Sequence, residues 1–256
     1  SFKKVPFNNK VSEEIKINQI LSWIDLPVGE KPRLIMSWWH GIDSQGHKFG
    51  TRDQRTIEQL NKQNKNLLEL INQLDKRNAW EYLTLFIVSD HGMTDISNFI
   101  NLKSTLETAG IDASVYDGPA VAHIFLNSED IDRAKEVLSN IQEIEIYKKN
   151  ETPSNLHLDH PSRSGDIIVT TNAPNMFLSN SKVKNILATL LGPKGMHGYK
   201  PLDPNMTAIF FAMGKGVEIL DSEITINQVD LAPTIADILN ITLPYEVDGN
   251  SIQNIK

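Results

Sequence analysis

The chain has 256 residues, 40% apolar and 22% charged, which is typical of a globular protein and unlike a disordered or fibrous one. Its net charge of -7 and the absence of any basic block argue against a nucleic-acid duplex as partner. No apolar run reaches the roughly 18 residues that span a bilayer. No cysteine is present, which excludes disulfides and thiolate metal sites.

Apolar runs and helical spacings of apolar residues alternate along the chain. In chain order they predict a helix over Val11–Ile24 capped by Ser12, a buried strand over Pro32–Trp39, a long amphipathic helix over Thr51–Asn78, strands over Leu83–Ser89 and Ala120–Leu126, a helix over Glu129–Ile141, strands over Gly165–Thr171 and Met206–Gly214, and a closing helix over Gln228–Leu239. This alternation favours an α/β fold with a mostly parallel central sheet and helices on both faces. Without a repeat or a low-complexity linker, residues 1–256 are expected to form a single domain.

Carboxylate and imidazole side chains gather in three stretches near predicted strand ends. Asp43 and His47 are four residues apart, so a helix beginning at Ser44 would place both on one side of a turn. Asp90 and His91 directly follow a strand, and His197 lies in the Gly- and Pro-rich stretch GPKGMHGYKP. Taken singly, each has an ordinary alternative, such as a helix cap, a strand turning at the surface or a solvated histidine.

Taken together, these two aspartates and three histidines supply the oxygen and nitrogen ligands that zinc accepts. The carboxyl ends of strands are also where open α/β sheets hold their sites. Two neighbouring metals would suit an in-line displacement at phosphorus, one activating the nucleophile and the other stabilising charge on oxygen. His123, inside an apolar strand, is expected to be a core histidine. His157 and His160 are expected to lie in a mobile loop rather than to bind metal.

The order and spacing of three motifs resemble a known family. Asp43-Ser44-Gln45-Gly46-His47 is followed by Gly50, then by Ser-Asp-His-Gly-Met over Ser89–Met93, and then by Met-His-Gly-Tyr over Met196–Tyr199. In this the chain resembles the nucleotide pyrophosphatase/phosphodiesterases of the alkaline phosphatase superfamily. Ile20–Pro27 and Met206–Val217 also look like connecting segments of that family, so the resemblance covers nearly the whole chain.

The resemblance implies two zinc ions and their ligands. Asp43, His47 and His197 would bind one zinc, and Asp90 and His91 the other. Family members carry a further Asp ligand and a nucleophilic Thr or Ser upstream of the first motif found here. None of the nearest hydroxyls occupies the nucleophile's place in the pattern; they are Ser44, Thr51, Ser89 and Thr94. The chain is therefore expected to be the carboxyl-terminal part of a catalytic domain whose partner is its missing amino-terminal half.

The resemblance also implies a nucleotide substrate. Family members place an aromatic residue five positions before the first metal Asp, where it stacks on the base, and Trp38 stands there. The alternative for Trp38 is a core tryptophan, while Trp39 alternates to the opposite face and is a core candidate. The leading hypothesis is a two-zinc hydrolase of phosphodiester or pyrophosphate bonds in nucleotides or dinucleotides, acting through a covalent phospho-enzyme. The alternatives are a phosphomonoesterase or phospholipid-head-group hydrolase of the same superfamily, or a non-catalytic fragment.

Location is indicated only weakly. Three N-x-[ST] acceptors occur at Asn150, Asn205 and Asn240, although Pro153 after the first triplet disfavours it. They favour a glycoprotein of the secretory pathway, extracellular or anchored to a membrane through a missing segment. The chain itself opens with no signal peptide and contains no membrane segment.

Overall fold

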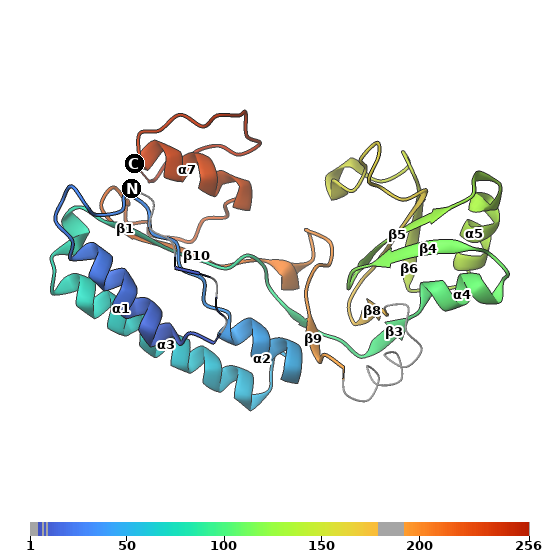
Figure 1. Ribbon diagram of the computed structural model, residues 1–256, viewed down its shortest axis with the longest axis horizontal. Helices are drawn as coiled ribbons and strands as arrows, with labels where there is room; N and C mark the ends of the chain where they lie inside the picture. The colour runs from blue at the N-terminus through green and yellow to red at the C-terminus, as the bar shows by residue number, and fades with distance from the viewer. Residues whose placement is uncertain (1–4, 7, 9, 179–191, 256) are drawn as a thin grey trace. The chain divides into compact units, whose positions relative to one another are not determined.

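The computed structural model describes residues 5, 6, 8, 10–178 and 192–255 (Figure 1). The chain divides into two compact units. The first unit comprises Ser1–His40, Leu60–Asp90 and Ile209–Lys256, and the second comprises Gly41–Gln59 and His91–Ala208. A compact unit can be part of a larger domain, so the expectation of one domain over residues 1–256 stays a prediction.

The first unit contains helices and a two-stranded sheet. Its elements are α1 (Glu13–Ile24), the second part of α3 (Gln54–Asp75), the 3-10 turn η1 (Ala79–Glu81), β1 (Thr84–Val88), β10 (Phe210–Gly214), the 3-10 turn η5 (Gln228–Asp230) and α7 (Leu231–Ile238). β1 and β10 pair antiparallel. Figure 1 shows α1 and α3 on one side of this pair and α7 on the other.

The predicted helices of the first unit form for the expected reasons. Ser12 caps α1 by accepting the N–H of Ile15, which satisfies one of the amides left unpaired at a helix start. Pro233 lies in the first turn of α7, where its missing N–H costs nothing. Apolar side chains of α1 and α3 then meet in one buried cluster of Ile17, Leu21, Ile24, Leu70, Leu74 and Ala79.

The predicted strand over Pro32–Trp39 is wrong. The segment pairs with no strand among the described residues. The burial of its apolar side chains nevertheless alternates. Ile35 and Trp39 pack against the α1–α3 cluster, whereas Leu34, Met36 and Trp38 are exposed. An apolar alternating run reports which face is buried, whereas a strand also needs a hydrogen-bonding neighbour.

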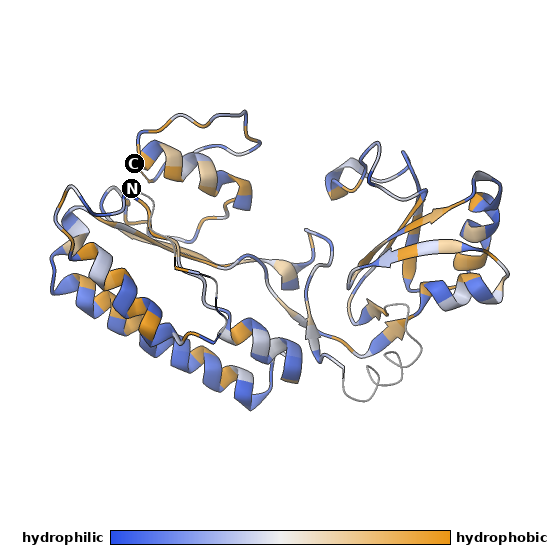
Figure 2. Ribbon diagram, in the orientation of Figure 1, coloured by the Kyte–Doolittle hydropathy of each residue, from blue (hydrophilic) through white to orange (hydrophobic). Residues whose placement is uncertain are grey.

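The second unit is built around a sheet of four antiparallel strands in the order β4-β5-β7-β6. Its elements are α2 (Gly41–Phe49), β2 (Thr94–Asp95), β3 (Asn98–Ile100), α4 (Leu102–Thr108), β4 (Ala113–Asp117), β5 (Val121–Leu126), the 3-10 turn η2 (Ser128–Asp130), α5 (Ile131–Leu138), β6 (Ile144–Lys148), the 3-10 turn η3 (Ser154–Leu156), β7 (Ile167–Thr171), β8 (Asn175–Phe177), β9 (Gly195–Met196) and the 3-10 turn η4 (Pro204–Met206). Figure 2 shows apolar residues along β5 of this sheet.

The α/β class is confirmed, but the described strands do not form a mostly parallel sheet. Only β3 and β8 pair in parallel, whereas the other pairs run antiparallel. The alternation of strands and helices along the chain had favoured a parallel sheet. β7 is indeed buried along its whole length, but as an inner strand of an antiparallel sheet.

Candidate metal centre

Helix α2 brings the first two predicted ligands together. It begins at Gly41, three residues before the expected start, so Asp43 and His47 lie one turn apart on the same side. The Nε2 atom of His47 is 3.3 Å from Oδ1 of Asp43. The four-residue spacing in the sequence predicted this arrangement correctly.

The third ligand comes from a stretch about 150 residues further along the chain. β9 pairs with β2, and the N–H of Lys194 donates to the carbonyl oxygen of His47 at 2.8 Å. His197 follows β9 directly, with its Nε2 atom 3.7 Å from Oδ1 of Asp43. One ligand atom from each of Asp43, His47 and His197 lies within 4.8 Å of the others.

Two glycines allow α2 to approach β9. A Cβ atom on Gly195 would lie 2.6 Å from the carbonyl oxygen of Gly46, and a Cβ on Gly46 would lie 2.4 Å from the sulfur of Met93. Carbon atoms do not approach backbone oxygens or sulfur so closely without displacement. The absence of both side chains therefore sets the separation between the helix with Asp43 and His47 and the strand that leads to His197.

The chemistry of the three atoms fits a bound cation. Nδ1 of His47 lies 2.9 Å from the carbonyl oxygen of Gly195, and since a carbonyl only accepts, this nitrogen carries a proton. The other ring nitrogen, Nε2, lies 3.3 Å from Oδ1 of Asp43, which is buried and has no hydrogen-bond partner. A proton on Nε2 of His47 could join this nitrogen only to Oδ1 of Asp43. A metal ion at the same place would also bind Nε2 of His197.

The distances agree with this interpretation. Ligand atoms around one tetrahedral zinc lie about 3.3–3.5 Å apart, close to the 3.3 Å and 3.7 Å separations from Oδ1 of Asp43. A histidine ligand commonly donates its other ring N–H to a backbone carbonyl, as His47 does to Gly195. The residues present therefore fit a metal ion bound through two nitrogens and one oxygen.

The second pair of predicted ligands is only partly brought to this group. The ring of His91 stacks on that of His197, with centroids 3.6 Å apart, and Nδ1 of His91 donates to the carbonyl oxygen of Gly92. Asp90 lies two residues beyond the end of β1 in the first unit, where its carbonyl oxygen accepts a hydrogen bond from Gln228. Neither belongs to a three-ligand cluster among the described residues. Their role in a second metal site stays a prediction.

Trp38 is not a core tryptophan. Its side chain is 51% exposed, and its ring stacks on that of His40 with centroids 5.0 Å apart. Trp39 instead packs against the α1–α3 cluster, as the alternation along the segment predicted.

The histidines at 123, 157 and 160 lie outside the candidate metal site. His123 on β5 accepts the N–H of Gly165, and burial lowers the pKa of its ring, which keeps it neutral. His160 accepts the N–H of Ser162, and His157 ends the short turn η3. Neither belongs to a three-ligand cluster in the described part of the chain.

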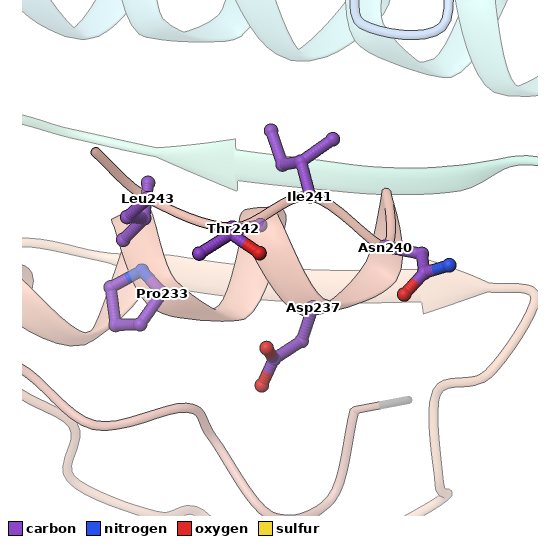
Figure 3. A pocket seen from close by; sticks show the side chains of 7 residues that line it. Pro233, Asp237, Asn240, Ile241, Thr242 and Leu243 are labelled. Carbon is purple, nitrogen blue, oxygen red and sulfur yellow. The ribbon is translucent and has the colours of Figure 1, made fainter.

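A concavity beside α7 lacks this chemistry. A cavity of about 560 Å³ is lined by Pro233, Ala236, Asp237, Asn240, Ile241, Thr242 and Leu243 (Figure 3). Asp237 is the one ionisable group in this lining, and the cavity holds no histidine. This cavity therefore does not fit the metal ligands that the sequence predicts.

Sequence reasoning missed the residues that hold the ligands. Gly195 supplies the carbonyl that fixes His47, and Met93 fills the space between the two glycines. The glycines of SQGHK and PKGMH were a usable signal, because glycine often marks a close approach of two backbones.

Comparison with known proteins shows that the chain belongs to a known family. Residues 1–200 match the family described as type I phosphodiesterase / nucleotide pyrophosphatase. Human ectonucleotide pyrophosphatase/phosphodiesterase family member 5 is 29% identical over 255 residues, which cover 98% of this chain and 51% of the relative. A Xenopus laevis protein named bis(5'-adenosyl)-triphosphatase is 28% identical, over 92% of this chain and 50% of its own length. The chain thus spans about half the length of these curated relatives.

Solved structures of two relatives have a similar fold. The murine and human ectonucleotide pyrophosphatase/phosphodiesterase 5 structures both superpose with a TM-score of 0.82, at 25% and 28% identity. They cover 95% and 98% of this chain, and 64% of each solved chain is matched. This likeness confirms the predicted α/β fold of the alkaline phosphatase superfamily.

The glycine contacts generate a testable prediction. Gly195→Ala should lower the free energy of unfolding by about 1–3 kcal/mol, because the added methyl meets the backbone of Gly46. Chemical denaturation of the intact protein measures the change. Gly29→Ala is the control, since a Cβ there has no atom within 4 Å, and it should change the free energy by less than about 0.5 kcal/mol. Equal effects of the two substitutions would contradict the close packing of α2 and β9.

Proposed function

Because the chain belongs to the type I phosphodiesterase / nucleotide pyrophosphatase family, we propose that it is part of an enzyme that hydrolyses phosphodiester or pyrophosphate bonds of nucleotides. The observation that carries the proposal is the convergence of Asp43, His47 and His197 on one point. Carboxylate and imidazole ligands without thiolate suit a hydrolytic zinc site better than a magnesium site.

Two zinc ions complete the proposed site, the first held by Asp43, His47 and His197, the second by Asp90 and His91 with a further ligand from outside these residues. When bound, zinc supplies positive charge that offsets the charge developing on the phosphoryl oxygens. The protein's own contribution is orientation. The Gly195 carbonyl holds the His47 ring, and the stacked rings of His91 and His197 restrict each other's rotation.

The nucleophile is proposed to be a Thr or Ser hydroxyl in an amino-terminal half that these residues do not include. It attacks phosphorus, the leaving alcohol or phosphate departs, and water then opens the covalent phospho-enzyme. Partial coverage of the relatives supports this partner, since only about half of their length is matched.

The first unit offers backbone groups to such a partner. β1 pairs on one edge with β10 and has no second strand partner among the described residues. The run Pro32–Trp39, which packs against the α1–α3 cluster, makes no described strand pairing either. Unpaired strand edges are places where a further strand adds by backbone hydrogen bonds.

The proposed substrate is a nucleotide or dinucleotide whose base stacks on Trp38. The half-exposed ring supports this role, because a base needs an accessible aromatic face. The relatives point the same way. One is named a bis(5'-adenosyl)-triphosphatase, and an inactive variant of the murine relative was solved in complex with AMP.

An extracellular or secretory location is proposed, with any membrane anchor supplied by a segment outside these residues. Relatives include proteins named ectonucleotide pyrophosphatases and venom phosphodiesterases. Asn150, Asn205 and Asn240 are all exposed, as glycan acceptors must be. No helix in the described residues is long and apolar enough to cross a membrane.

Substitution of single ligands tests the proposed metal sites. The intact protein should contain close to two zinc ions. Asp43→Ala and His197→Ala should each remove about one zinc from the same site, because they share it, and His91→Ala should empty the other. Elemental analysis of purified variants measures the content. His157→Ala is the control and should leave two zincs. Calcium or magnesium alone in an active protein, or zinc loss in His157→Ala, would refute the assignment.

Trp38 tests the nucleotide substrate. Trp38→Leu should raise the Michaelis constant for a nucleotide ester by roughly five- to a hundredfold, the value of one base–aromatic stack. Trp38→Tyr should retain most of the affinity because it keeps a stacking face. A small phosphoester without a base should be hydrolysed by all three proteins at similar rates. Equal losses on both substrates would refute base stacking by Trp38.

A further inference from the structure

The loop that carries His197 is anchored to the four-stranded sheet of the second unit. On β6, Ile144 and Ile146 face the core formed with α4 and α5. Side chains alternate along a strand, so Glu145 and Tyr147 lie on the opposite face. The residues that follow His197 make their contacts on this second face.

The first anchor is an ion pair. Nζ of Lys200, three residues after His197, donates to the carboxylate of Glu145, and the hydroxyl of Tyr147 donates to the same carboxylate. The Lys200 ammonium holds the pKa of Glu145 below its usual value. Burial, with Glu145 as neighbour, raises the pKa of Tyr147 to about 12. Lys200 therefore meets a carboxylate that is charged and already oriented.

The second anchor is a buried hydrogen bond. The hydroxyl of Tyr199 donates to the carbonyl oxygen of Asn175 on β8 at 2.7 Å. Tyr199 is 6% exposed, and burial raises its pKa to about 12. Between this anchor and His197 stands only Gly198, whose φ of +88° turns the chain where other residues would be strained.

His197 is thus restrained from both sides. Before it, Gly195 accepts the hydrogen bond of His47, and after it, Tyr199 and Lys200 hold the chain to β8 and β6. We propose that Tyr199 and Lys200 are positioning residues that preorganise His197 for metal binding, so that the four-stranded sheet acts as the platform of the metal site. This inference rests on the proposed function, since it requires metal at Asp43, His47 and His197.

The chain supplies a matched control on the same strand. Lys148 also lies on β6 and forms an ion pair with Asp132 of α5, on the sheet face opposite Glu145. Both pairs join a lysine and a carboxylate, but only Lys200–Glu145 restrains the His197 loop. Replacing either lysine removes one positive charge from the surface, so both substitutions share that effect. Only the loss of Lys200–Glu145 would also release the His197 loop.

The experiment measures zinc affinity by chelator competition in the intact protein carrying Asp90→Ala, so that only the site of Asp43, His47 and His197 is filled and the ring of His91 still stacks on that of His197. Tyr199→Phe and Lys200→Met should weaken zinc binding by several-fold, up to about tenfold, at the lower end of effects seen for groups that orient ligands. Lys148→Met should bind zinc like the parent. Lys200→Arg, which keeps the charge and the reach, should restore most of the affinity. The melting temperature of the metal-free proteins should not follow the order of affinities.

Three outcomes would overturn the inference. The first is an unchanged zinc affinity in Tyr199→Phe and Lys200→Met, which would mean that the metal site does not depend on these two residues. The second is an equal loss in Lys148→Met, or losses that track the metal-free melting temperature in every variant. The third is the absence of zinc binding in the protein with Tyr199 and Lys200 unchanged, which would refute the proposed function as well as the inference.

Discussion

The approach of α2 to β9 at Gly46 and Gly195 is the constraint on which the site depends. Gly195 fills two requirements at once, because it leaves room for the helix backbone and directs its carbonyl at Nδ1 of His47. The hydrogen bond selects the ring tautomer, and the tautomer turns a nitrogen lone pair toward Asp43. The distance and the orientation of the His47 ring therefore both follow from one backbone contact.

The second unit brings together residues far apart in sequence, two on helix α2 and the third in the loop after β9. Asp43 and His47 take their spacing from a helical turn, whereas His197 takes its position from the strand before it and the anchored loop after it. Such support from rigid elements is what a preorganised metal site needs, since ligands on free loops pay ordering entropy on binding. The antiparallel sheet, which contributes no ligand, thereby acquires a functional role.

The sequence predicted the local geometry of the candidate site better than the architecture around it. The motif DSQGH places Asp43 and His47 at a fixed short spacing, and such local geometry is readable from a helical period. The helix start at Ser12 was readable for the same reason, since a cap acts within a few residues.

Pairing between strands was not readable in this way. The segment Pro32–Trp39 has the composition and alternation of a strand but lacks a described partner. The alternation of strands and helices favoured a parallel sheet, although β7 pairs antiparallel with both of its neighbours. β4 and β6 went unpredicted because Ala113–Asp117 and Ile144–Lys148 mix polar with apolar residues, and the hydrogen bonds that make them strands come from β5 and β7. Non-local hydrogen bonding leaves little trace in a local window.

The central claim, that Asp43, His47 and His197 bind one metal ion, is tested most directly by anomalous X-ray diffraction from crystals of the intact protein grown with zinc. Data collected on both sides of the zinc absorption edge locate the ion without reference to activity. The account predicts a difference peak about 2.0–2.2 Å from an oxygen of Asp43 and from Nε2 of both histidines. A zinc-saturated crystal with no peak at this position, or with its peak at His157 and His160 instead, would contradict it.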